Sequence, residues 1–200
     1  TLFLGHNNKH PSKTEYHLYA DDTQLHISFK PAGFHQSSET LSSAFSDIVS
    51  WTHNNKLMLN PSKTELLLIG TSQQRKKLSD VTSISLGNTT IPVSTSARNL
   101  GFIFDSDMSL TSQVNLVCKS SHFHIRDIRR IRNLIPLSIA ITLANSLVSS
   151  RLDYCISLYF GMSKQNIQKL QRLQNSLARA ITQTSKYQHI PPVLKDLHIL

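Results

Sequence analysis

Hydrophobic and polar positions alternate in two different ways along the 200-residue chain. Up to about residue 108, apolar residues tend to recur at every second position, which is the spacing of one face of a β-strand. Beyond that point they recur every three to four residues, as they do on one face of an α-helix. The pattern therefore predicts a mixed α+β region over residues 1–108 and an all-helical region over residues 109–200.

Short apolar runs separated by turn residues predict the strands of the first region. Residues 17–29 are expected to form two short strands joined by a tight acidic turn. Alternating apolar residues predict the second of these strands. Gly87-Asn88 is a typical two-residue hairpin turn. We expect one helix, which begins at capping residues, over residues 37–55. Further strands are expected at residues 65–69, 82–86, 89–93 and 99–104.

Three amphipathic helices are expected in the second region, at residues 109–132, 137–148 and 164–181. The first places Lys119, Arg126 and Arg130 within about 40° of one another, given 3.6 residues per turn. Its opposite, apolar side is formed by Val114, Val117, Ser121, Ile125 and Ile128. The apolar side of the last helix is formed by Ile167, Leu170, Leu173, Leu177 and Ile181.

Positive charge is concentrated in the second half of the chain. The formal charge is +9 overall, and residues 101–200 hold twelve Lys and Arg against five Asp and Glu. A basic region of this kind indicates contact with a polyanion, most often nucleic acid. The alternative is a basic surface that only keeps the protein in solution, with the three cations of the first helix as a solvated face.

No targeting or membrane signal is visible in the sequence. No stretch approaches the roughly 18 to 20 apolar residues that a membrane-spanning helix needs, and no signal peptide is evident. The two cysteines are too few and too distant in sequence to suggest a disulfide framework. We therefore expect an intracellular protein, nuclear or cytoplasmic, with no membrane partner.

The tetrapeptide Tyr19-Ala20-Asp21-Asp22 is the strongest candidate for chemistry. Adjacent carboxylates at a hairpin tip repel one another, and Mg²⁺ removes this repulsion because it prefers carboxylate oxygens and keeps positions free for phosphate. Two such ions about 4 Å apart can activate an attacking hydroxyl and stabilise departing pyrophosphate. The tetrapeptide alone is a weak signal, since Asp-Asp also occurs in ordinary solvated turns.

Four segments in order resemble the reverse transcriptases of LINE-type (non-LTR) retrotransposons. The YADD turn with its two strands resembles motif C. SDIVSW and LMLNPSKTE, at residues 46–51 and 57–65, look like motif D, and ARNLGFIFD at residues 97–105 looks like motif E, the primer grip. RLDYC at residues 151–155 and the stretch 167–181 resemble the thumb-like helical region that follows. The resemblance covers nearly the whole chain from about Tyr16.

The resemblance implies a partial polymerase palm, made of antiparallel strands and a helix, followed by a small thumb-like domain. It also implies that Asp21 and Asp22 hold Mg²⁺ in a two-metal site. Lys63 matches the motif D lysine, which would protonate the departing pyrophosphate or stabilise its charge. The alternative for Lys63 is an ordinary surface lysine.

The resemblance further implies contacts with nucleic acid. Tyr19 would lie near the primer end, although it could also be an ordinary strand aromatic. Leu100 and Gly101 match the primer-grip turn, where glycine permits a sharp bend. The implied partners are an RNA template, a DNA primer and deoxynucleotides.

The family's remaining catalytic aspartate belongs to motif A, which lies upstream of motif B. Neither motif is present in these 200 residues, and the first residue is Thr1 rather than Met. We therefore expect a piece of a longer polymerase that is inactive by itself. The alternative is a non-catalytic nucleic-acid-binding protein or an inert remnant of a decayed element.

Overall fold

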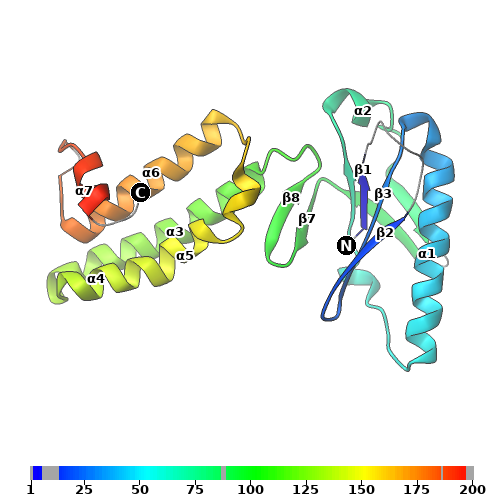
Figure 1. Cartoon of the computed structure of the whole chain (residues 1–200), viewed down its shortest axis with the longest axis horizontal. Coiled ribbons are helices and arrows are strands. Elements are labelled where there is room, and N and C mark those ends of the chain that lie inside the picture. Colours follow the sequence, from blue (N-terminus) through cyan, green and yellow to red (C-terminus); the bar gives the residue numbers. More distant parts are fainter. Residues whose placement is uncertain (1, 6–13, 87–88, 186, 197–200) are drawn as a thin grey trace. The chain divides into compact units, whose positions relative to one another are not determined.

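The chain folds into two units that we describe separately. A computed structural model describes residues 2–5, 14–86, 89–185 and 187–196. Compact packing divides the chain into Thr1–Ser109 and Leu110–Leu200, one residue beyond the boundary that the sequence pattern suggests. The described part of the first unit contains both strands and helices, and that of the second is helical, which confirms the α+β class (Figure 1).

The first unit is built on a six-stranded sheet. Two antiparallel hairpins, β2–β3 and β5–β6, flank β1 and β4. The neighbouring pairs β1–β3, β1–β4 and β4–β6 are parallel, so the sheet is mixed rather than wholly antiparallel as the resemblance implied. The predicted turn residues Gly87 and Asn88 lie outside the described residues. In sheet order the strands are β2 Glu15–Tyr19, β3 Asp22–Ser28, β1 Leu2–Gly5, β4 Leu66–Ile69, β6 Thr89–Ser94 and β5 Ser83–Leu86.

Helix α1 (Phe34–Asn54) covers one face of this sheet. It begins three residues before the predicted start, because the short 3₁₀ turn Pro31–Gly33 leads directly into it. Strand residues that alternate toward α1 are buried, as β-pleating requires. The core that results contains Leu25, Ile27, Phe29, Leu41, Leu66, Leu68, Ile84, Leu86 and Ile91.

A two-stranded ribbon lies on the other side of the sheet from α1 (Figure 1). Its strands are β7 (Ser96–Asn99) and β8 (Phe102–Asp105), and β7 lies beside β4. The prediction of one continuous strand over residues 99–104 is therefore wrong. Leu100 and Gly101 form a two-residue turn, and both residues have a positive φ angle, +47° and +83°. Such a turn matches the twist of the strands that it joins.

The second unit is a set of packed helices. The longest two, α3 (Thr111–Ile131) and α6 (Lys164–Thr182), pack against each other. The predicted apolar side of α3 is buried at all five positions, whereas Ile167 on the apolar side of α6 is half-exposed. No described helix is long and apolar enough to cross a membrane. The shorter helices are α4 Leu137–Ala144, α5 Ser150–Asp153 and α7 Pro191–Asp196.

A wide helical turn joins α4 to α5. Residues Asn145–Ser149 form a π-helix, whose hydrogen bonds reach one residue further than those of an α-helix. The buried residues here are spaced by four: Ala140, Ala144, Val148 and Leu152. In an ideal α-helix each such step rotates the side chain by about 40°, so three steps would move Leu152 off the core. The wider turn reduces this rotation and keeps all four on one face.

Candidate functional site

The acidic turn lies at the tip of the β2–β3 hairpin. Tyr19 pairs with Asp22, and Ala20 and Asp21 make the turn between them. All four residues are exposed, so both carboxylates face solvent. Ala20 has a φ of +51°, a left-handed conformation that costs a residue with a Cβ about 1–2 kcal/mol. A strained backbone therefore holds two adjacent carboxylates at an accessible tip.

Asp22 shares a face of the sheet with Gln24, because alternate residues of a strand point the same way. Leu25 and Ile27 point to the opposite face, which α1 covers. Asp22 therefore faces the side on which the β7–β8 ribbon lies. The directly opposed pairs on this polar face are Tyr19–Asp22, His17–Gln24 and Glu15–His26, and the last pair is joined by a 2.8 Å contact between Glu15 Oε2 and His26 Nε2.

A hydrogen bond connects the acidic hairpin to the β7–β8 ribbon. Gln24 Nε2 donates to Asn99 Oδ1 over 2.8 Å, and both side chains are half-buried. Gln24 is two residues beyond Asp22, a distance of about 7 Å along the strand. Asn99 directly precedes the Leu100–Gly101 turn. The structure thus brings together the acidic turn and the turn predicted to grip the primer.

The motif D-like segment reaches the same ribbon. The backbone N–H of Arg98 donates to Glu65 Oε2 over 2.9 Å. Glu65 follows the 3₁₀ turn Pro61–Lys63, whose Lys63 side chain is exposed. No hydrogen bond or ion pair joins Lys63 to either aspartate in the described part of the chain. Its role in pyrophosphate release stays a prediction.

The acidic turn presents two adjacent carboxylates that could hold a metal ion. Both are exposed, so an ion bound there would keep open positions for water and phosphate, as Mg²⁺ sites commonly do. Across residues 2–5, 14–86, 89–185 and 187–196, no three His, Cys, Asp or Glu side chains gather as a metal-binding group. The binding of Mg²⁺ by Asp21 and Asp22 stays a prediction.

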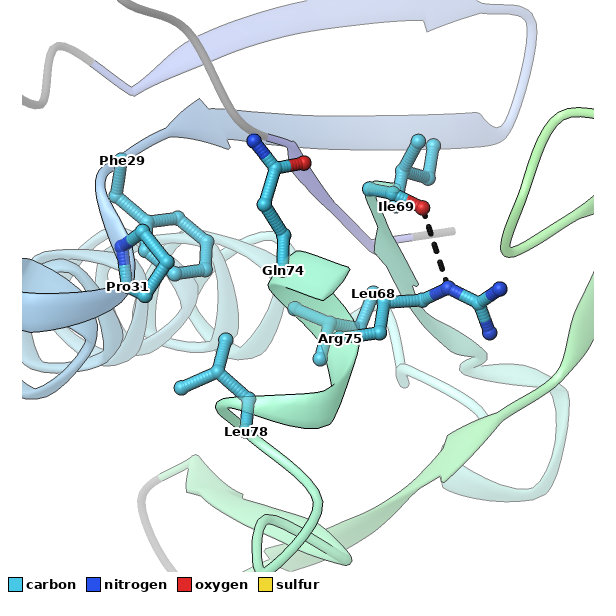
Figure 2. Close-up of a pocket in the computed structure, with 8 residues that line it drawn as sticks. Phe29, Pro31, Leu68, Ile69, Gln74, Arg75 and Leu78 are labelled. Carbon is cyan, nitrogen blue, oxygen red and sulfur yellow. Dashed lines mark hydrogen bonds between the residues drawn. The ribbon is translucent and has the colours of Figure 1, made fainter. Parts of the chain in front are cut away.

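A small pocket lies elsewhere in the first unit, where α2 (Ser72–Lys76) meets the sheet. Figure 2 shows the Arg75 side chain extending away from the apolar Phe29 and Leu78. Arg75 Nε donates to the Gly70 carbonyl over 3.1 Å, and Nη1 donates to Ser106 Oγ over 3.0 Å. The pocket holds no more than about one water molecule. Arg75 therefore links the segment at Gly70 to the segment at Ser106 by hydrogen bonds, and the pocket is too small for a ligand.

Three titratable groups with shifted pKa values also lie away from the acidic turn. The backbone N–H of Ser109 donates to Asp107 Oδ1 over 3.1 Å and lowers the pKa of that carboxyl. Burial raises the pKa of the Cys118 thiol and of the Tyr159 hydroxyl. These shifts follow from local packing, and none of the three groups was a predicted site residue.

Several basic side chains of the second unit bind backbone or side-chain oxygens of the same unit. Arg129 Nη2 donates to the Ser176 carbonyl over 3.3 Å, and Lys169 Nζ donates to Asn115 Oδ1 over 2.8 Å. Arg132 donates to the carbonyls of Ile135 and Ile181. These cations stabilise the unit by satisfying its own acceptors.

The predicted basic residues of α3 differ from these. Lys119, Arg126 and Arg130 are exposed on the side opposite the buried residues, and we call these three the α3 stripe. Within the described structure, Lys119 and Arg126 make no hydrogen bond or ion pair, and Arg130 makes one exposed ion pair of 3.7 Å with Asp127. The α3 stripe is therefore available to an external anion.

The two units carry very different charges. Residues 110–200 hold twelve Lys and Arg against three Asp and Glu, whereas residues 1–109 hold nine of each. The whole formal charge of +9 thus belongs to the helical unit. Electrostatic attraction to a polyanion is expected there rather than on the unit with the acidic turn.

No protein-family model, curated protein or solved structure matches this chain. The likeness to reverse transcriptases therefore rests on the four quoted sequence segments. The contact of Gln24 with Asn99 is a separate observation, because the sequence does not show that the two segments containing them meet. No local pattern marks them, since the two lie 75 residues apart.

Proposed function

We propose that the chain is the carboxyl-terminal part of an RNA-directed DNA polymerase of a LINE-type retrotransposon. The observation that carries this proposal is the Gln24–Asn99 hydrogen bond. It joins the hairpin of the two aspartates to the Leu100–Gly101 turn, and these segments are the two that such a polymerase needs at a primer end. A chance resemblance in separate segments gives no reason for them to meet.

The proposed chemistry is nucleotide addition. The primer 3′-hydroxyl attacks the α-phosphate of a deoxynucleotide, an oxygen–phosphorus bond forms, and pyrophosphate departs. Bound Mg²⁺ would lower the pKa of the hydroxyl and neutralise charge on the phosphates. Asp21 and Asp22 would hold this ion together with a carboxylate supplied by motif A. Lys63 would provide positive charge for the departing pyrophosphate.

The remaining predicted residues would position nucleic acid. Tyr19 lies beside Asp22 on the polar face, where it would contact the primer end. The exposed Leu100 and Gly101 would support the primer strand. The α3 stripe would bind phosphates of the RNA template and DNA primer without reading their sequence, because Lys and Arg neutralise the backbone charge.

The test is primer extension by the longer reading frame that contains this chain. Asp22→Asn should reduce incorporation on a primed RNA template to background, because it removes a metal-binding charge from an exposed turn without removing packed atoms. Asp80→Asn is the matched control, since Asp80 is an exposed carboxylate outside the segments that resemble the polymerase motifs. Near-normal incorporation by the Asp22 variant would refute the metal assignment.

A further inference from the structure

The exposed aromatic residue Phe123 lies beside the α3 stripe, on the same side of the helix. Phe123 is 53% exposed, whereas the core residues of α3 lie on the opposite side of the helix. At 100° per residue Phe123 lies within about 60° of Lys119, Arg126 and Arg130. An exposed phenyl ring therefore lies among three cations.

The immediate neighbours of the ring leave much of it accessible. The guanidinium carbon of Arg126 lies 5.2 Å from the ring centroid, a cation–π distance. The His124 ring meets Phe123 edge-on, with centroids 5.5 Å apart. An exposed cation–π pair stabilises a helix only slightly, so it does not by itself explain a large apolar side chain at this position.

We propose that Phe123 is a stacking site for an unpaired base of a single-stranded nucleic acid whose phosphates lie along the α3 stripe. Charge complementarity favours this occupant, because the unit carries twelve cations against three anions. Among the described residues, Lys119 makes no hydrogen bond or ion pair, and Arg126 has only its cation–π contact with Phe123. The stripe runs about 16 Å from Lys119 to Arg130, enough for several phosphates of one strand. The inference rests on the proposed function, in which α3 contacts nucleic acid.

A single strand fits this surface better than a duplex does. In a duplex each base is stacked between its neighbours, so a phenyl ring on a helix surface meets only sugars and base edges. In an unpaired strand the face of a base is accessible, and aromatic rings interleaved with cations are the usual binding surface. Phe123 would therefore add affinity for bases to the affinity that the α3 stripe has for phosphates.

The experiment separates the contribution of bases from that of phosphates. Binding of the 200-residue chain is measured by fluorescence anisotropy, at several salt concentrations, with two labelled probes of equal length. One probe is oligodeoxythymidylate, and the other is an abasic strand with the same phosphates. The natural chain should prefer the thymidylate probe by about tenfold, since stacking on one aromatic contributes on this order.

Phe123→Leu keeps an apolar side chain but removes the ring, and it should abolish this preference while leaving the salt dependence unchanged. Phe160→Ala is the matched control, because Phe160 is 95% exposed and lies outside α3. Circular dichroism shows whether each variant is folded, and Phe123→Ala provides a second variant that also lacks the ring. These results would support the stacking site.

Three other outcomes would overturn the inference. Equal affinity of the natural chain for the two probes would leave only a phosphate contact, and a preference that survives Phe123→Leu would locate the stacking elsewhere. If neither probe bound in a salt-dependent way, the nucleic-acid contact of α3 in the proposed function would fail as well. The first two outcomes would leave that contact intact.

Discussion

Gln24 and Asn99 show how single side chains can define a site that spans much of a unit. Each supplies one amide group to a half-buried hydrogen bond of 2.8 Å. Gln24 lies on the face of β3 that carries Asp22, and Asn99 ends the strand before Leu100. The bond therefore links the strand after the acidic turn to the strand before the Leu100–Gly101 turn, although neither amide would take part in chemistry.

A double-mutant cycle tests this bond. Gln24→Ala, Asn99→Ala and the double variant should show a coupling free energy of about 1 kcal/mol, which is typical of a protein hydrogen bond. The free energy of unfolding of the first unit can be followed in urea by the fluorescence of Trp51, the sole tryptophan in the sequence. Gln36→Ala, an exposed residue of α1, should combine additively with Asn99→Ala. Additive effects of Gln24→Ala and Asn99→Ala would show that the bond is absent in solution.

At the scale of elements, the long helices were the most predictable from sequence. A 21-residue helix repeats its apolar spacing through several turns, so the buried side of α3 could be identified at all five positions. Ile167 belongs to the apolar face of α6 but is half-exposed, because no neighbour among the described residues covers it in the first turn of the helix. The periodic pattern is the same whether or not a neighbour is present. Periodicity predicts a face, and only packing decides how far along the helix that face is buried.

The strands and the candidate site were less predictable. Residues 99–104 read as one strand because their apolar residues continue across Leu100-Gly101, and the turn depends on backbone angles that hydrophobicity does not report. The acidic turn itself was evident, since both carboxylates lie in four consecutive residues. The contact between Gln24 and Asn99 was not evident, because no local pattern specifies which strands meet when they are 75 residues apart in the sequence.

The α3 stripe makes a prediction about salt dependence. Replacing Lys119, Arg126 and Arg130 together by alanine should flatten the slope of log affinity against log salt for a primer–template duplex by roughly two to three units. The reason is that each neutralised phosphate releases counterions. Titration of a labelled primer–template at several salt concentrations measures the slope for the 200-residue chain.

The control for this experiment removes the same amount of charge elsewhere. Lys56, Lys76 and Lys77 are exposed residues of the first unit, and their triple alanine variant should leave the slope nearly unchanged. An identical slope in the natural chain and the α3 variant would mean that the three cations form only a solvated face.

At the scale of the whole molecule, charge and candidate chemistry belong to different units. The first unit has balanced charge and carries the acidic turn, whereas the second carries the net positive charge. We therefore expect the second unit to account for most of the electrostatic attraction to nucleic acid.

We expect the 200-residue chain to show no templated nucleotide incorporation. The proposed two-metal site needs a further carboxylate, and motif A, which would supply it, is not present in these 200 residues. Extension of a primed RNA template measures this, with Asp21→Asn/Asp22→Asn as the matched control. Incorporation above that control would contradict the assignment of the missing aspartate to motif A.

The π-helical turn between α4 and α5 has a consequence for the length of the chain. Deleting one exposed residue there, such as Ser146, would change the spacing from Ala144 to Val148 from four to three. Buried positions would then be spaced by four, three and four, which an ordinary α-helix keeps on one face. The helix should therefore tolerate a one-residue deletion at this turn, whereas the same deletion in the middle of α6 would rotate Leu177 and Ile181 away from the core. Among related chains, differences of a single residue in length should gather between Ala144 and Val148.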